Sequence, residues 1–509
     1  MLQLELLVGL FLAAVSLAGL ARRVGAPYPV FLAIGGALLA FLPITASFAL
    51  PPELVLAVFV APILLDAAYD ASVRDLRDNW LPVTGLVVFA VGLTTAAVAI
   101  VVRWLIPEMP WAPAIALGAV VAPPDAVAAT AVLRPLKPPH RLLTILEGES
   151  LLNDATALLI YRLAVGAVAA DGFTVGDVAP AFLLGVAGSL VAGPALGWIT
   201  MRLLSGIDHV PTMIILQFVT TFLVWMIAEG IGLSGVLTMV CYAMSVAQTA
   251  PARTPARARI PTYAVWETVI FALNILAFIF IGLQLRGILN DLQPADTSRY
   301  FAVAGAVLLT VILVRIAWHM PFNALIRRRE RIHGFHPPRP MLRPTLGSGL
   351  IISWSGMRGI VSLAAALALP AEFPYRDLIL LTAFAVVVGT LVVQGLTLKP
   401  LLRTLDLHDD DPVGREVRIA RERALHAGVA SLAHDGSAMA KAVRDEFTAR
   451  LSEESGDGEQ AARNNMRFVA LDAARKTVHA MRDADEIGDD AFHRLEEELD
   501  WLEMAGGGR

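Results

Sequence analysis

Side chains that carry oxygen are concentrated in one short segment of an otherwise apolar stretch. The segment EGESLLND begins at Glu147 and ends at Asp154. In a helix, Glu147, Ser150 and Asp154 share one face, and Glu149 and Asn153 share the adjoining face. Carboxylate, hydroxyl and amide oxygens are the ligands that hard cations prefer. No cluster of His and Cys with zinc or iron spacing accompanies them, so the pattern indicates a site for a hard cation or for protons.

Asp154 lies deepest in this segment, roughly 11 residues into the apolar run 143–169. An ionisable side chain at that depth of a membrane helix is expensive, and it is a functional candidate for that reason. A carboxylate there can hold a proton or a small cation, but not both. That competition is the minimum chemistry of exchange. The alternative is that Asp154 only forms a hydrogen bond across a helix bundle.

The elements that must position these residues are long apolar runs. Hydrophobic residues make up 56% of the chain and charged residues 17%. Residues 409–509 hold 23 acidic and 14 basic side chains, against 22 and 26 in the first 408 residues. Long runs with few charges are typical of membrane spans. We therefore predict an all-α polytopic membrane domain over residues 1–405 and a small helical tail over 406–509. The weak, scattered basic charge argues against nucleic acid as a partner.

The apolar runs predict thirteen membrane-spanning helices, because each run has about the 20 residues that a crossing needs. The least certain division separates the eighth span from the ninth, since only Gly230 lies between them. Helical patterns in the tail are expected over 415–434, 438–453, 459–483 and 489–504. The predicted spans are 3–21, 27–43, 52–69, 81–102, 113–132, 143–169, 178–201, 211–229, 231–248, 263–285, 301–323, 346–370 and 377–398.

The orientation of these spans follows from the basic residues in their connections. Connections after odd-numbered spans carry 17 Lys and Arg residues, whereas those after even-numbered spans carry four. Lys and Arg collect on the cytoplasmic side of a membrane. We therefore expect the N-terminus outside, the tail in the cytoplasm, and the protein in the cell membrane.

Two of the spans are interrupted near their middle. The fifth contains Pro123 and Pro124, which remove two amide donors and leave carbonyls without partners. The twelfth contains Gly356 and Gly359 around Arg358. Spans five and twelve cross the membrane in opposite directions, and such a pair of broken helices in two inverted halves marks the binding site of a transporter. The alternative to a binding site is that the prolines only kink one helix and the glycines only allow close packing of the other.

Several further charges lie inside the spans. Asp125 follows the two prolines and is either a cation ligand facing Asp154 or an acid that offsets the helix dipole. Arg358 must be neutralised, and we expect a structural salt bridge with Glu149. Asp66 is either a ligand on the entrance side or an interfacial charge. The remaining charged or titratable residues in or near spans are interpreted as solvated or packing residues; they are Arg162, Glu229, Glu267, Arg315 and His319.

Three segments resemble the bacterial sodium/proton exchangers of the first branch of the monovalent cation:proton antiporter superfamily. They are residues 123–127 (PPDAV), 147–156 (EGESLLNDAT) and 355–363 (SGMRGIVSL). The second is specific to this family, and the resemblance covers about residues 1–405. It implies two inverted repeats, in which spans 4–6 and 11–13 form a core that moves against a dimerisation domain. It also implies a homodimer in membrane lipid.

The resemblance also implies roles for individual residues. Asp154 would be the carboxylate shared by proton and cation, and Ser150, Asp125 and Asp66 would complete the Na⁺ site. Glu149 would pair with Arg358. Asn153, which precedes Asp154, resembles the residue that the electroneutral branch has at this position. Electrogenic relatives carry a second aspartate there. No cofactor is implied beyond the transported Na⁺ and H⁺.

The leading hypothesis is a secondary antiporter, not an enzyme, that exchanges Na⁺ for H⁺ by alternating access and serves pH homeostasis. Selectivity among Na⁺, Li⁺ and K⁺ stays open, and K⁺/H⁺ antiport is one alternative. A passive cation channel is another, although nothing resembles a repeated carbonyl filter. An intramembrane hydrolase is set aside, because the sequence contains neither a Gly-x-Ser-x-Gly elbow nor a His-Glu-x-x-His motif.

Overall fold

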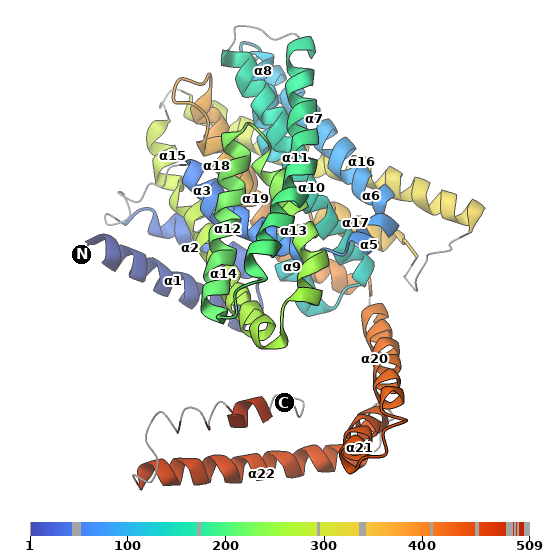
Figure 1. Cartoon of the computed structure of the whole chain (residues 1–509). Coiled ribbons are helices and arrows are strands. Elements are labelled where there is room, and N and C mark those ends of the chain that lie inside the picture. Colours follow the sequence, from blue (N-terminus) through green and yellow to red (C-terminus); the bar gives the residue numbers. More distant parts are fainter. Residues whose placement is uncertain are drawn as a thin grey trace. The chain divides into compact units, whose positions relative to one another are not determined.

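The computed structural model describes residues 2–42, 52–169, 175–292, 296–334, 343–407, 411–453 and 458–484, together with residues 492, 495 and 498–502. Regular secondary structure in these residues is helical, and they contain no β-strand. The chain divides into two compact units, Met1–Asp410 and Asp411–Arg509, and most of their helices are labelled in Figure 1. The expected all-α membrane architecture is confirmed.

The first unit consists of helices that correspond to the predicted spans. The first seven are α1 (Leu2–Val24), α2 (Tyr28–Leu39), α3 (Pro52–Val55), α4 (Ala61–Asp70), α5 (Val73–Asp78), α6 (Trp80–Thr84) and α7 (Val91–Leu105). Two π-helical turns, η2 (Leu56–Val60) and η3 (Gly85–Ala90), join α3 to α4 and α6 to α7. The next seven are α8 (Trp111–Val121), α9 (Ala126–Leu133), α10 (His140–Ala169), α11 (Val175–Leu204), α12 (Val210–Gly230), α13 (Gly235–Arg253) and α14 (Ala256–Leu283). A 3₁₀ turn, η4 (Arg134–Leu136), follows α9, and the unit ends with α15 (Leu285–Asp291), α16 (Thr297–His333), α17 (Leu346–Trp354), α18 (Ile360–Leu367) and α19 (Arg376–Thr404).

Every predicted span overlaps a helix or a series of consecutive helices, with span ends that differ by a few residues, and residue 43 lies outside the described residues. Gly230 does end a helix, and Ser234 caps the next one by accepting a hydrogen bond from the Leu237 amide at 3.3 Å. Among the described residues, eight helical stretches are long and apolar enough to cross a membrane on their own. Thirteen crossings, and their orientation, stay a prediction.

Both interrupted spans are broken where the sequence indicated. Helix α8 ends at Val121, and the chain is irregular until Asp125 caps α9 by accepting a hydrogen bond from the Val127 amide at 2.9 Å. Helix α17 ends at Trp354, and residues 355–359 are irregular before α18 begins. The cause of the first break is two missing proline amides; the second follows from the low helix propensity of glycine.

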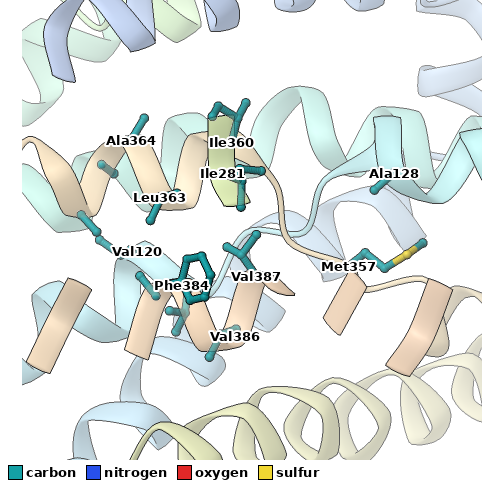
Figure 2. Close-up of a cluster of buried hydrophobic side chains, with 14 of the residues drawn as sticks. Val120, Ala128, Ile281, Met357, Ile360, Leu363, Ala364, Phe384, Val386 and Val387 are labelled. Carbon is teal, nitrogen blue, oxygen red and sulfur yellow. The ribbon is translucent and has the colours of Figure 1, made fainter. Parts of the chain in front are cut away.

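The broken helices are enclosed by other helices on several sides. Helix α10 packs against α8, α9, α4 and α17, while α19 packs against α8, α9, α17 and α18. Figure 2 shows apolar side chains gathered around the two irregular links, with Met357 on one link and Ala128 just beyond the other. Irregular backbone at membrane depth is tolerated where protein surrounds it or where it lines a cavity, and this arrangement supplies both conditions.

The second unit is helical and is described by itself. It contains α20 (Pro412–Ser431), α21 (Ala438–Glu453) and α22 (Gly458–Asp483). Helices α20 and α21 pack together, and Arg444 donates a hydrogen bond to the Leu432 carbonyl at 2.9 Å. Three of the four predicted tail helices are therefore present, and most of the fourth, over 489–504, lies outside the described residues.

Candidate functional site

A small cavity of about 70 Å³ lies where the broken helices meet α4, α10 and α14. Its lining includes the polar side chains of Asp125, Ser150 and Asp154. Pro123 and Pro124 of the first irregular link also line it. A single water needs about 10–15 Å³ of such space. The cavity is therefore large enough for a small cation that keeps a few waters.

Asp125 joins the two irregular links to each other. Its backbone amide donates a hydrogen bond to the Met357 carbonyl at 2.6 Å. Its carboxylate accepts from the Val127 amide, and this makes it the N-cap of α9. Asp125 therefore caps a helix, as an acid there should, and it also lines the cavity. Its role as a cation ligand stays a prediction.

Helix α10 supplies the groups that satisfy the first link. The Ser150 hydroxyl oxygen accepts a hydrogen bond from the Ala126 amide at 3.2 Å. The Asn153 side chain donates to the Pro124 carbonyl at 3.2 Å. The interruption of the helix leaves these two backbone groups without helical partners. Ser150 faces the cavity, whereas Asn153 is not among the residues that line it.

Asp154 lies one turn beyond Ser150 and is only 6% exposed. Its carboxylate lines the cavity and makes no hydrogen bond or ion pair with any other described residue. A buried carboxylate without a partner is strongly destabilised unless a proton or a cation neutralises it. The interpretation of Asp154 as a simple hydrogen-bonding group across the bundle therefore has no support among the described residues.

The expected ion pair between Glu149 and Arg358 is wrong. The Arg358 guanidinium donates instead to the carbonyls of Val121, at 2.9 Å, and Ala122, at 3.2 Å, and to that of Gly356. These carbonyls end α8 and begin the irregular segment of the second broken helix, where no helical amide can reach them. A positive charge also suits the negative end of the α8 dipole. Arg358 therefore holds both helix breaks together without a carboxylate partner among the described residues.

Glu149 pairs with Arg315 of α16. The two guanidinium nitrogens lie 2.5 and 2.7 Å from the two carboxylate oxygens, and the side chains are 1% and 3% exposed. Arg315 also donates to the Ile352 carbonyl, at 3.1 Å. Arg315 and His319 were interpreted as solvated or packing residues, and both are buried, so they are not solvated. His319 lines a second cavity, of about 360 Å³, between α10, α16 and α17.

Asp66 does not line the small cavity that contains Asp154. Its neighbours Ile63 and Ala67 line the small cavity, but Asp66 lines a different one, of about 450 Å³, between α4, α11, α12, α13 and α14. Glu147 does line the small cavity, but it forms an ion pair with Arg134 at 2.9 Å. Its carboxylate is therefore already neutralised.

Two polar residues of the cavity were missed in the sequence. Ser362 of α18 and Asn274 of α14 both line it. Ser362 belongs to the segment 355–363, so its position near the second break was available as a signal. Asn274 carries no charge and was not considered, although an amide within the apolar run 263–285 is itself unusual in a membrane span.

The fold and the site define a class of protein before any comparison is made. Two broken helices meet at a small cavity lined by Asp125 and Asp154, neither of which forms an ion pair with a described residue, in a chain with many apolar helices. This arrangement is that of a secondary transporter for a small cation. Comparison with known proteins gives the family: a profile of the sodium/hydrogen exchanger transmembrane family matches residues 10–404, and the chain belongs to that family.

Relatives and a solved structure agree with this family. A Na⁺/H⁺ exchanger of Mycobacterium tuberculosis (strain ATCC 25618 / H37Rv) is 30% identical over 98% of this chain and 96% of its own length. A sodium, potassium, lithium and rubidium/H⁺ antiporter of Bacillus pumilus is 26% identical over 94% of this chain and 74% of its own. The sodium proton antiporter MjNhaP1 of Methanocaldococcus jannaschii matches 80% of this chain and 99% of its own with a TM-score of 0.60 at 17% identity, a likeness of fold.

Proposed function

We propose that this protein is a secondary antiporter that exchanges a monovalent cation, with Na⁺ as the main substrate, for H⁺ at Asp154. The observation that carries the proposal is that Asp125 and Asp154 line one cavity and that neither carboxylate forms an ion pair with a described residue. The site needs no cofactor, because its chemistry is limited to binding and release of a proton and a cation. Membership of the exchanger family supports the same reaction.

The balance of buried charge explains why the two substrates compete. Glu149 is neutralised by Arg315 and Glu147 by Arg134. Among the described residues, the buried charges that remain around the helix breaks are those of Asp125, Asp154 and Arg358. When both carboxylates are ionised, two negative charges face one positive charge, so one negative charge is in excess. One proton or one monovalent cation removes that excess. Exchange of one for the other carries no net charge, which supports an electroneutral mechanism and agrees with Asn153 standing before Asp154.

Alternating access would follow from movement of one wall of the cavity relative to the other. One wall consists of the broken helices and α10, and the other consists of α4 and α14. In the family arrangement these belong to the core and to the dimerisation domain. We propose that the protein works as a homodimer in the cell membrane, with the tail in the cytoplasm.

The test is cation-dependent proton movement in proteoliposomes that contain the purified full chain and a preformed pH gradient. Na⁺, Li⁺ and K⁺ are added in turn over roughly pH 6.5–9, a range in which a carboxylate buried away from water can exchange its proton. We expect each effective cation to dissipate the gradient, with Na⁺ the most effective. A larger response to K⁺ would favour K⁺/H⁺ antiport, and absence of any response would refute antiport.

A coupling experiment separates antiport from a passive channel. When Na⁺ is placed on one side of vesicles without a pH gradient, and the membrane potential is clamped with K⁺ and valinomycin, an antiporter creates a pH gradient. A cation channel cannot do so, because it moves Na⁺ without moving H⁺. A Na⁺ current without a change in pH would contradict the proposal.

Replacing Gly359 with alanine is expected to abolish exchange. A Cβ atom at this position would overlap the Asp125 Oδ2 atom and would lie 2.6 Å from its Cγ atom. Real contacts of that length do not occur, so the carboxylate or the second helix break must move away. The matched control is Gly92→Ala in α7, where nothing lies within 4 Å of the added carbon. Exchange by Gly359→Ala at the rate of Gly92→Ala would contradict the prediction.

A further inference from the structure

The two walls of the small cavity differ in polarity. On the wall made by the broken helices and α10, the lining includes Asp125, Ser150, Asp154 and Ser362. On the wall made by η2, α4 and α14, the residues that line the cavity are Val60, Ile63, Leu64, Ala67, Asn274, Ala277 and Phe278. Among these described residues of the second wall, Asn274 alone has a polar side chain.

The Asn274 amide is available for a ligand. The residue is 9% exposed, and its side chain makes no hydrogen bond or ion pair with any other described residue. Buried amides are nearly always hydrogen-bonded, because loss of water without a replacement partner is unfavourable. Its neighbours in α14, including Ile275, Ala277 and Phe278, are buried and apolar. The Asn274 amide therefore lines a cavity that is also lined by carboxylates, and it has no hydrogen-bond partner among the described residues.

We propose that Asn274 is a ligand of the transported cation, through its amide oxygen, and that it is contributed by the wall opposite the carboxylates. The inference rests on the proposed exchange at Asp154 and extends it. Na⁺ accepts carbonyl-type oxygens as readily as carboxylates, whereas a proton bound to Asp154 has no need of Asn274. The residue therefore favours the cation over the proton in the competition for the site.

A ligand from the second wall also has a mechanical consequence. When the broken helices move relative to α14, the amide oxygen leaves the cation, because the carboxylates move with one wall and Asn274 stays with the other. The cation is then bound more weakly in the new arrangement than in this one. Asn274 would thereby help to release the cation on the far side.

The test measures how the exchange rate depends on Na⁺ concentration in proteoliposomes with Asn274→Leu and Asn274→Ala. We expect the half-saturating Na⁺ concentration to rise about tenfold, the effect of losing one polar contact to a charge, with little change in the maximal rate. Asn274→Asp keeps an oxygen and should need less Na⁺ than Asn274→Leu. The matched control is Gln394→Leu in α19, which removes another amide that is 0% exposed and has no hydrogen-bond partner among the described residues, but does not line the cavity.

Each outcome decides the inference. The inference is overturned if Asn274→Ala reaches half-saturation at the same Na⁺ concentration as the wild type. It is also overturned if Gln394→Leu raises the half-saturating Na⁺ concentration as much as Asn274→Ala does, because that result would show a packing effect. If the wild-type protein fails to exchange, the proposed antiport is refuted instead. Thermal stabilisation of the purified proteins by Na⁺ then tests binding alone: Asn274→Ala should need about tenfold more Na⁺ than wild type. Equal stabilisation, or none in the wild type, would overturn the inference.

Discussion

Asp154→Asn is expected to abolish cation/proton exchange while the protein still folds and inserts in the membrane. Asparagine has nearly the same size and shape as aspartate, but it cannot take up a proton or neutralise a cation at neutral pH. The excess negative charge that one proton or one Na⁺ balances is thereby removed from the cavity. Since Asp154 makes no hydrogen bond with a described residue, the substitution leaves no protein partner stranded.

The measurement is Na⁺-dependent dissipation of a pH gradient in proteoliposomes, with the amount of monodisperse protein determined in parallel. Asp66→Asn is the matched control, because Asp66 lies on a neighbouring helix and lines a different cavity. We expect Asp66→Asn to retain exchange and to differ from wild type far less than Asp154→Asn does. Retained exchange in Asp154→Asn would refute the assignment of the shared carboxylate. Complete loss in Asp66→Asn would mean that the larger cavity takes part in the transport path.

Much of the fold could be predicted because its determinants are local. Pro123 and Pro124 remove amide donors wherever the chain goes, so the first break follows from the sequence alone. The predicted spans coincide with helices because a helix satisfies its own backbone within an apolar run. The two π-helical turns, η2 and η3, were not predicted, since each inserts one residue into a turn and leaves no mark on composition.

The site was predicted less completely because it depends on which way each helix faces. Glu149 could pair with either of two buried arginines, and the choice of Arg315 over Arg358 is made by the packing of α16 against α17. Arg358 is engaged by backbone carbonyls that exist only because the broken helices meet. Asp66 and Ala67 are adjacent in sequence, yet they line different cavities. Such a rotation of less than a third of a turn cannot be determined from an apolar run without a strong periodic pattern.

Removing one partner of the pair between Glu149 and Arg315 is expected to destabilise the protein strongly. Both side chains are almost completely buried, so Glu149→Leu leaves the Arg315 charge without its carboxylate in apolar surroundings. Breaking such a buried pair costs about 3–5 kcal/mol. The Arg315 side chain also lies against the second helix break, since a Cβ atom at Gly356 would lie 2.5 Å from its Cδ atom. We expect a marked fall in the thermal midpoint and in the yield of inserted protein.

The double variant Glu149→Leu/Arg315→Leu tests whether the cost comes from the stranded charge or from the loss of the pair itself. Replacing both partners of a buried pair with apolar residues is often neutral, so we expect the double variant to be more stable than either single variant. Glu108→Gln is the matched control, because Glu108 forms an ion pair with Arg299 at 2.7 Å with both side chains about half exposed, and little change is expected there. Single variants as stable as wild type would show that water reaches Arg315. A double variant less stable than both single variants would instead show that the ion pair itself makes a net contribution to stability. The presence of the pair would then be explained by stability alone, without a role in positioning the helix break.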